Sequence, residues 1–452
     1  MTVPISDKRI EQRVIIRSAR VILITDCTIL LCTVVTSLAG ARALGPAGRG
    51  DLLVIALWPL VIAMLAELGL TNAHRYWMAK EPERCSRLFS NAVIYTAIVG
   101  TISIALADVV VPHLVGQRSA QVMTLLRIYQ INIPAALFLN LMRGLLEGTR
   151  RFGWAGMARL LTFVVQGTSF AVLWSLGNLT VSTATYTLIC AQTASTLLAT
   201  FAVWHQLRPR WQPSWTEFKN SMHYGLRDYP GCVADFTTLR LDQLMLGGVA
   251  SSAAIGLYVI AVRLSEVTTY VAEALAGALM PEVAGARAGD QAESLLGRTL
   301  RLTLYTNVLV LIPLWLAAPL ILRVLFGASF VPATGAFRWL LVAAVVWSAG
   351  TIVISGLQGF GYPGLSTIAR FLSAAVTAPA LLILLPRMGI EGAAIASLIG
   401  YSVMLVAAII ALVQRRQLGF WRYLRPQRHD IPIARLRALA NLRWASARGI
   451  ES

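Results

Sequence analysis

Among the ionisable side chains inside long apolar stretches of this chain, where charge is costly, eight are candidates for a role within the membrane. They are Asp26, Arg127, Asp235, Arg240, Asp242, Arg263, Glu266 and Glu273. An ionised group in hydrocarbon costs roughly 2.5–3.5 kcal/mol on insertion scales, so such groups usually face a polar interior or pair with one another. Arginine offers a planar fork of donors that suits an anionic group, and a nearby carboxylate can hold that arginine or carry a proton. The expected chemistry is therefore the binding of an anionic group within a membrane.

A purely structural interpretation of these charges stays open. Glu266 follows Arg263 by one helical turn, and Glu273 lies two turns further on. These residues and the charged residues of the preceding stretch, 224–249, could simply form ion pairs that hold the two helices together. For Arg240 and Asp242 that interpretation is favoured, because they lie close to an expected external turn. The candidate substrate-binding residues are Arg263, Arg240, Arg127, Glu266 and Asp235, and the candidate ion-coupling residues are Asp26 and Glu273.

The sequence shows no pattern typical of a metal site or of nucleophilic catalysis. The five histidines are scattered singly, and the five cysteines have no ligand spacing. The longest expected external loop, residues 108–119, holds few groups suited to catalysis. We therefore expect no metal, no cofactor, no catalytic residues and a protein that is not an enzyme.

The segments that carry the buried charges are long and apolar. Hydrophobic residues make up 57% of the 452 residues and charged residues 13%, which is about half the charged share of a soluble domain. A helix that crosses a bilayer needs about 20 apolar residues. Twelve stretches qualify: 18–43, 50–77, 89–112, 120–146, 154–176, 179–206, 224–249, 253–281, 299–322, 332–357, 364–385 and 391–413. These runs are too long for barrel strands, so all are predicted to be transmembrane helices.

Lysine and arginine are distributed unequally between the two sides of these helices. With the N-terminus in the cytoplasm, thirty of the 39 fall on the inner side and six on the outer side. The outer six are Arg42, Arg49, Arg118, Arg323, Arg338 and Arg387. Cytoplasmic loops carry the excess of positive charge, so we expect a multi-pass protein of the bacterial inner (cytoplasmic) membrane with both termini cytoplasmic. The net charge of +18 then reflects topology, and no nucleic-acid partner is expected.

The end of the chain is basic and aromatic. Residues 415–452 hold nine arginines, with Trp421, Tyr423 and Trp444 between them. From Ile431 onward, apolar residues recur at helical spacing with arginines off that face. This pattern predicts an amphipathic helix on the inner leaflet, in contact with anionic lipids. An RNA-binding tail is the alternative.

Two parts of the chain resemble each other. Gly148-Thr149-Arg150-Arg151-Phe152 aligns with Gly359-Phe360-Gly361-Tyr362-Pro363 at an offset of 211 residues, and a weaker echo pairs Gly50–Ala56 with Gly256–Ala261. An even number of helices per half implies parallel repeats about a pseudo-two-fold axis along the membrane normal. We therefore expect an all-α integral membrane fold of about twelve helices. Its parts are a six-helix bundle (1–207), a cytoplasmic linker (208–223), a second six-helix bundle (224–414) and the basic tail (415–452), with a cavity between the bundles.

Several motifs occur in an order typical of one group of transporters. They are ALGPAGRG (43–50), ELGL (67–70), LRLDQLMLG (239–247), AIGLYVIAVRL (254–264), LQGFG (357–361) and PRMGIEGAA (386–394). Over nearly the whole chain, this series resembles the Wzx-like polysaccharide flippases of the MOP (MATE-like) superfamily. The resemblance implies a transporter that flips an undecaprenyl-diphosphate-linked oligosaccharide repeat unit from the cytoplasmic to the outer leaflet for polysaccharide biosynthesis.

A diphosphate carries two or more negative charges, so the resemblance assigns its binding to Arg263 and Arg240, and then to Arg127. A proton or sodium ion is expected as a coupling partner. Three other functions stay open. The arginines argue against a cation-coupled MATE-like multidrug exporter, the number of helices argues against a lipid II flippase, and the short external loops argue against a membrane glycan polymerase or ligase.

Overall fold

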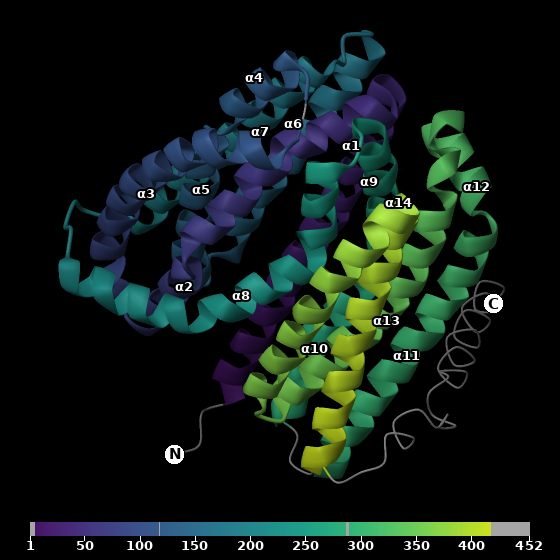
Figure 1. Cartoon of the computed structure of the whole chain (residues 1–452). Helices are drawn as coiled ribbons and strands as arrows, with labels where there is room; N and C mark the ends of the chain where they lie inside the picture. Colours follow the sequence, from purple (N-terminus) through teal and green to yellow (C-terminus); the bar gives the residue numbers. More distant parts are fainter. Residues whose placement is uncertain (1–4, 117, 286–288, 417–452) are drawn as a thin grey trace, which may run out of the picture. The chain divides into compact units, whose positions relative to one another are not determined.

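The structure is a computed structural model that describes residues 5–116, 118–285 and 289–416. The described chain is helical and has no β-strand (Figure 1). Its first helices are α1 (Ile5–Glu67), α2 (Leu70–Lys80), η1 (Pro82–Arg84), α3 (Cys85–Leu114), α4 (Ala120–Tyr129), α5 (Asn132–Gly148), α6 (Phe152–Ser175), α7 (Val181–Leu207) and α8 (Trp215–Val249). The others are α9 (Ser252–Glu266), α10 (Tyr270–Gly285), α11 (Gly289–Leu316), α12 (Ala318–Ile321), η2 (Leu322–Phe326), η3 (Ala328–Ala333), α13 (Thr334–Gly359) and α14 (Pro363–Arg416). The predicted amphipathic helix of the tail lies outside the described residues.

Eight helical stretches of the described chain are long and apolar enough to cross a membrane, or nine if the bent pair α9–α10 forms one span. Two of the eight, Thr28–Glu67 and Pro363–Arg415, each extend over two of the predicted spans in whole or in part. They are broken between those spans by Gly45 (φ 63°) and Gly389 (φ 58°). Helix α8 coincides with a predicted span but carries too many polar residues to pass the same test. Each of the twelve predicted segments thus lies mainly in helix, although some contain a break, and the expected all-α membrane fold is confirmed.

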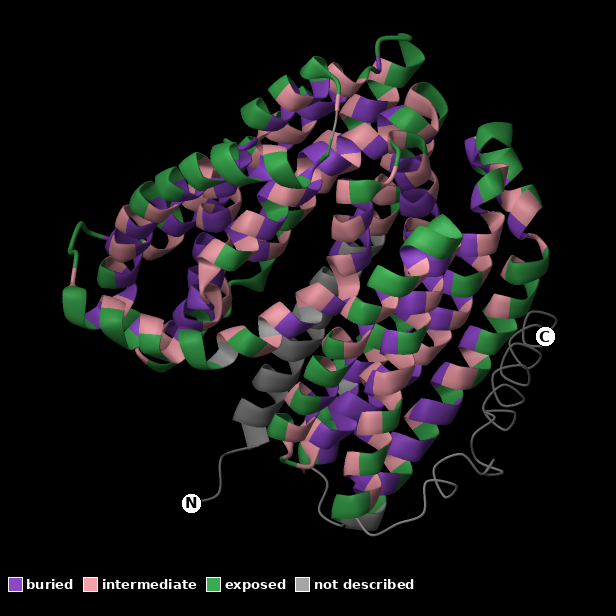
Figure 2. Ribbon diagram, in the orientation of Figure 1, coloured by how far each residue is buried: buried purple, intermediate pink, exposed green. Residues whose placement is uncertain are grey.

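Stripes of exposed apolar residues distinguish this fold from a soluble bundle. On α3, Ile98, Ile102, Leu106 and Val109 are each more than half exposed and follow one another at spacings of three or four residues. Figure 2 shows exposed positions alternating with buried ones around the long helices. A soluble monomer rarely exposes a contiguous apolar stripe of this kind, whereas a membrane helix presents it to lipid.

The chain divides into two compact units. The first comprises Met1–Leu264, Ala317–Leu340 and Thr377–Ser397. The second comprises Ser265–Leu316, Leu341–Val376 and Leu398–Ser452. Each has its own buried apolar cluster, so each is described by itself.

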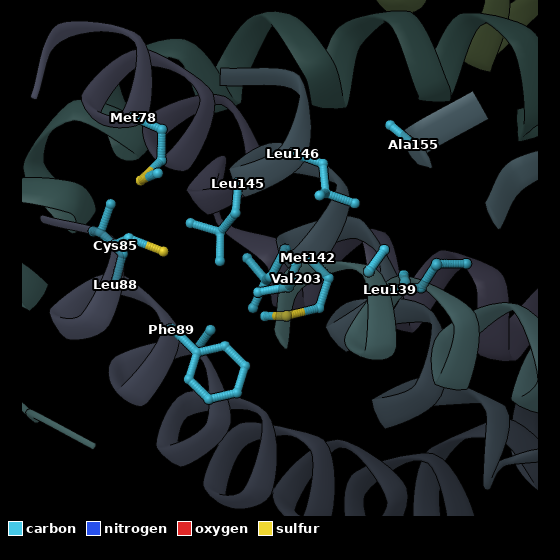
Figure 3. Packing of buried hydrophobic residues seen from close by; sticks show 14 of the residues in the cluster. Met78, Cys85, Leu88, Phe89, Leu139, Met142, Leu145, Leu146, Ala155 and Val203 are labelled. Carbon is cyan, nitrogen blue, oxygen red and sulfur yellow. The ribbon is translucent and has the colours of Figure 1, made fainter. Parts of the chain in front are cut away.

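The main cluster of the first unit lies among α2, α3, α5 and α7. Figure 3 shows Met78, Leu88, Leu145 and Val203 pointing toward one another from these helices. In lipid the hydrophobic effect does not drive helices together, so their association depends on close van der Waals packing. Small residues allow it here: a Cβ atom on Gly148 of α5 would lie 2.6 Å from the carbonyl oxygen of Arg75 in α2.

The same kind of close contact recurs in the second unit. A Cβ atom on Gly359 of α13 would lie 2.8 Å from the carbonyl oxygen of Met280 in α10. One turn earlier, the Ser355 hydroxyl donates to the Ala276 carbonyl at 2.5 Å, where the first unit has Gly144 against Thr71. Gly148 and Gly359 are the residues aligned by the internal repeat. Their matching contacts are what a repeat of two bundles predicts.

A break interrupts the second predicted span between α1 and α2. Leu68 (φ 48°) and Gly69 (φ 72°) both adopt left-handed backbone conformations there. The last carbonyls of a helix have no partner within it. In α1 the Leu65 carbonyl accepts from Tyr229 of α8 at 2.8 Å, and the Ala66 carbonyl accepts from Tyr95 of α3 at 2.6 Å.

Helix α8 crosses this break in direct backbone contact. A Cβ atom on Gly225 would lie 2.6 Å from the Leu68 carbonyl oxygen, so only glycine allows the approach. Beyond the crossing, α8 continues through Pro230 and is a long bent helix in Figure 1. Proline removes one helical hydrogen bond and is a usual cause of such bends.

Candidate functional site

Arg49 and Arg263 are the two cations whose placement is most informative. Arg49 stands in the first turn of the helical segment that follows the Gly45 kink in α1. Its side chain extends toward the preceding segment, where a Cβ atom on Gly40 would lie 2.8 Å from an Nη atom of Arg49. The charge of Arg263 in α9 acts on the Arg49 guanidinium, so the two cations lie within electrostatic range of each other.

One donor of Arg49 is buried without a partner. Its Nε atom has no hydrogen-bond acceptor among the described residues. A buried polar group without a partner costs free energy, and the cost is larger for a charged group beside a like charge. An anionic acceptor beside this Nε atom would remove that cost.

Reciprocal glycine contacts hold the segments that carry the two arginines. A Cβ atom on Gly50 would lie 1.7 Å from the Ser252 carbonyl oxygen, and one on Gly256 would lie 1.8 Å from the Pro46 carbonyl oxygen. Ser252 stands four residues before Gly256, and Pro46 stands four residues before Gly50, so the two contacts have the same form. Gly50 and Gly256 are also paired by the sequence echo. A contact that looks the same from both partners is expected where an approximate two-fold axis passes between them.

Asp242 lies in a packed polar cluster. Its carboxylate accepts hydrogen bonds from the Tyr258 hydroxyl of α9 (2.5 Å), the Gln243 backbone N–H (2.7 Å) and the Ser397 hydroxyl of α14 (3.2 Å). The residue is 4% exposed, and the charge of Arg240 acts on it. A buried, hydrogen-bonded carboxylate of this kind is consistent with a role of Asp242 in helix packing.

Arg127 lies in a different environment. It stands in the last turn of α4 and forms an ion pair with Asp108 of α3, with 3.0 Å between Nε and Oδ1. The two side chains are 60% and 49% exposed. The structure thus gives Arg127 a carboxylate partner on an accessible surface.

Glu266 and Glu273 flank the bend between α9 and α10. The Thr269 hydroxyl donates to the Glu266 carbonyl at 2.8 Å and approaches Oε1 of Glu273 at 3.4 Å. The two carboxylates are close enough for their charges to interact. The side chains of the remaining candidates, Asp26 and Asp235, lie outside the described residues.

Arg49 is not among the residues that hydropathy marks as charges inside a span. Hydropathy places it at the end of a span, where it belongs with the arginines of the outer loops. The sequence signal for Arg49 is its position directly between Gly48 and Gly50, because glycines on both sides indicate close packing around the arginine. No group of three or more histidine, cysteine, aspartate or glutamate side chains suited to a metal occurs among the residues that the structure describes.

A family model described as polysaccharide biosynthesis protein matches residues 41–334, more than half of the chain. The chain belongs to this family. The matched range includes Arg49 and Arg263, the reciprocal glycines Gly50 and Gly256, and Asp242.

Three other comparisons extend the family assignment. This polysaccharide biosynthesis protein is 22% identical over 195 residues to the probable low-salt glycan biosynthesis flippase Agl15 of Haloferax volcanii. That match covers 42% of the chain and 41% of the relative, so the chain spans about two fifths of the length of the curated relative it matches.

Solved structures show the fold. The lipid II flippase MurJ in an inward closed conformation has a TM-score of 0.75 at 11% identity, over 86% of this chain and 87% of that one. An inward-facing multidrug resistance MATE family transporter of the MOP superfamily has a TM-score of 0.67 at 18% identity, over 86% and 94%. The fold is that of the MOP-superfamily transporters, and the resemblance drawn from the sequence motifs is confirmed.

Proposed function

We propose that this protein flips an undecaprenyl-diphosphate-linked oligosaccharide repeat unit from the cytoplasmic to the outer leaflet for polysaccharide biosynthesis. The observation that carries the proposal is the reciprocal contact of Gly50 and Gly256, which brings the segments that bear Arg49 and Arg263 together within one unit. Two guanidinium groups repel each other strongly where water is scarce. A diphosphate removes that repulsion and accepts hydrogen bonds from both forks.

The chemistry of a lipid-linked sugar fits a protein with a charged interior and apolar flanks. The hydroxyls of an oligosaccharide would lose water in hydrocarbon without gaining replacement hydrogen bonds. The polyprenyl tail is as apolar as the membrane and can stay in it. The protein therefore has to shield only the headgroup and to neutralise the diphosphate.

The comparisons support this class of cargo. The matching family is one of polysaccharide biosynthesis, and two of the similar proteins are named as flippases for a glycan and for lipid II. Further contacts to the substrate are proposed for Arg240, Glu266 and Asp235, whereas the accessible ion pair of Arg127 with Asp108 argues against such a role for Arg127. Coupling to a proton or sodium ion is proposed for Asp26 and Glu273.

The proposed topology has both termini in the cytoplasm, in the inner membrane, with the basic tail against anionic lipids. Six-helix bundles over residues 1–207 and 224–414 would enclose the central cavity. The matching contacts of Gly148 and Gly359 and the reciprocal contact of Gly50 and Gly256 support a pseudo-two-fold relation between these bundles.

A second candidate function is cation-coupled export of drugs. It is favoured by the neighbouring carboxylates Glu266 and Glu273 and by the likeness to the MATE transporter. The approach of Arg49 and Arg263 opposes it, because two guanidinium groups repel a cationic drug.

Binding of undecaprenyl diphosphate to the purified protein tests the proposal. Arg49→Ala and Arg263→Ala should each weaken binding about tenfold or more, because a hydrogen bond to a charged group contributes about 1.5–3 kcal/mol. Lysine at either position should restore binding only in part, since a point charge cannot form a bidentate fork. The matched control is Arg387→Ala, which removes an exposed arginine elsewhere in the first unit.

A deletion strain provides the cellular test. Leaflet-resolved labelling should show lipid-linked repeat units accumulating on the cytoplasmic leaflet, together with loss of surface polysaccharide. Unchanged binding in both alanine variants, or normal polysaccharide export in the deletion strain, would overturn the proposal. New sensitivity to cationic dyes would instead favour the exporter.

A further inference from the structure

Arg118 binds main-chain carbonyl groups at the end of α8. One of its Nη atoms donates to the carbonyls of Gly247 and Ala250, at 3.0 and 2.9 Å. The other donates to the Ser252 hydroxyl at 2.6 Å, in the first turn of α9. A single side chain from the segment between α3 and α4 thus connects the end of one helix to the start of the next.

Arg42 makes the same kind of contact elsewhere. It stands just before the Gly45 kink in α1 and donates to the carbonyls of Val324 and Leu325 in η2, at 2.5 and 2.9 Å. The last carbonyls of a helix lack partners within it and carry the negative end of its dipole, so an arginine is a favourable ligand there. We call Arg42, Arg118 and the four carbonyls that they bind the carbonyl latch.

Close backbone contacts surround the latch. A Cβ atom on Gly248 would lie 3.0 Å from the Leu114 carbonyl oxygen. The Asp51 carboxylate accepts a hydrogen bond from Ser252, which is also bound by Arg118. Together with the contact between Gly50 and Gly256, these interactions join residues 42–51, Leu114 and Arg118 to residues 247–256 and 324–325.

Arg42 and Arg118 are two of the few arginines that the charge distribution assigns to the outer side. We infer that the carbonyl latch closes the outer end of the protein and has to open for cargo to leave toward the outer leaflet. Its acceptors are neutral carbonyls, and water can replace an arginine on such an acceptor at small net cost. The latch can therefore open and close repeatedly. This inference rests on the proposed transport across the membrane and on the proposed orientation, but not on the identity of the cargo.

A cysteine reporter behind the latch tests the inference. Val54 is 1% exposed and lies one turn beyond Gly50, and a Cβ atom on Gly247 would lie 4.0 Å from it. Val54→Cys is placed in a chain whose five native cysteines are replaced by alanine. A membrane-impermeant maleimide is then added to intact cells and to inside-out vesicles. With the latch intact, labelling from the outside should be slow.

Two independent changes should open the latch. The double variant Arg42→Ala/Arg118→Ala removes its donors, and Gly50→Ala places a methyl group where the Ser252 carbonyl lies. Each should raise the rate of external labelling about tenfold or more. Arg387→Ala, which removes an exposed outer arginine outside the latch, should leave the rate unchanged.

The outcomes separate this inference from the proposed function. The assay measures cysteine labelling and not transport of a sugar, so it reports opening even if the cargo is a different molecule. External labelling in both latch variants at the rate of the Arg387→Ala control would overturn the inference. Faster labelling only from the cytoplasmic side would also overturn it, because the latch would then close the inner end. If the double variant does not reach the membrane, the result for Gly50→Ala decides.

Discussion

Helix α8 is tied at both ends within the first unit, and the two attachments use different chemistry. At its start, the Glu217 carboxylate binds Arg84 at 2.9 Å and Arg87 at 3.1 Å, with the glutamate side chain 8% exposed. At its end, the carbonyls of Gly247 and Ala250 accept from Arg118. We call Glu81, Arg84, Arg87 and Glu217 the ion-pair joint, which contrasts with the carbonyl latch.

The ion-pair joint is reinforced by the linker that precedes α8. The backbone N–H groups of Arg210, Gln212 and Ser214 donate to Ser86, Ser90 and Asn91 of α3, at 3.0, 2.8 and 3.1 Å. Every second residue of the linker is thus fixed to the same helix. The part of the linker that precedes α8, residues 208–214, is thus hydrogen-bonded along α3.

The difference teaches which end of α8 can move. Separating a shielded carboxylate from two guanidinium groups leaves charges without partners, which costs several kcal/mol. Releasing an arginine from carbonyl groups leaves neutral acceptors that water can satisfy. We therefore expect the ion-pair joint to stay closed during transport, with opening confined to the carbonyl latch.

The largest effect is expected at the ion-pair joint itself. Glu217→Ala should lower the free energy of unfolding by about 3 kcal/mol, because Arg84 and Arg87 lose a shielded partner. Thermal unfolding in detergent would measure this loss. Glu83→Ala, which removes an exposed carboxylate from the adjacent turn, is the control and should change little. Equal unfolding midpoints in the two variants would show that the joint is not the stronger attachment.

The next effect concerns the crossing of α8 over the α1–α2 break. Gly225→Ala should cost about 2 kcal/mol, because its methyl group would lie 2.6 Å from the Leu68 carbonyl oxygen. Gly231→Ala is a matched control in the same helix, since no heavy atom lies within 4 Å of its added Cβ. That control should be neutral or stabilising by up to about 1 kcal/mol, because alanine favours helix. If both variants unfold alike, α8 is not held at the crossing.

A smaller effect is expected near the other end of α8. Tyr258→Phe removes one of the hydroxyl donors to Asp242 and should cost about 1–2 kcal/mol of unfolding free energy. Tyr186→Phe, at a position that is 49% exposed, should have no measurable effect on the unfolding midpoint. A loss as large as that of Glu217→Ala would mean that both ends of α8 are fixed equally firmly.

The smallest effect is expected at Arg127. Its ion pair with Asp108 is largely accessible, so Arg127→Ala should change stability by less than about 1 kcal/mol. Polysaccharide export in a complemented deletion strain should also be nearly normal, in contrast to Arg263→Ala. Loss of export in Arg127→Ala with normal protein levels would instead indicate that Arg127 binds the substrate.

Much of the fold could be predicted because hydropathy is a local property. Apolar runs of sufficient length become helices in a membrane, and all twelve predicted segments lie mainly in helix in the structure. The gaps between the predicted spans 18–43 and 50–77, and between 364–385 and 391–413, coincide with kinks at Gly45 and Gly389, where glycine readily adopts a positive φ. The helix break at Leu68 was not predicted, because leucine rarely adopts a left-handed conformation and gives no signal for it.

Candidate residues could be predicted better than their partners. A charge inside an apolar stretch is visible in the sequence, so Arg263 and Asp242 were both found. Which groups surround them depends on helices far apart in the chain. Tyr258 and Ser397 stand 16 and 155 residues from Asp242, and Arg49, which lies within electrostatic range of Arg263, belongs to the first helix.

The sequence by itself determined the helical membrane architecture, the family and the set of charges that a membrane would not tolerate at random. Hydropathy, turn residues and the asymmetry of positive charge suffice for these, because each acts over a short stretch of chain. Only the tertiary structure decided how the arginines are used. Arg49 lies within electrostatic range of Arg263, Arg127 pairs with Asp108, and Arg42 and Arg118 bind carbonyl groups. The physical reason is that the environment of a guanidinium group is set by helix packing, which glycine contacts between distant segments bring about.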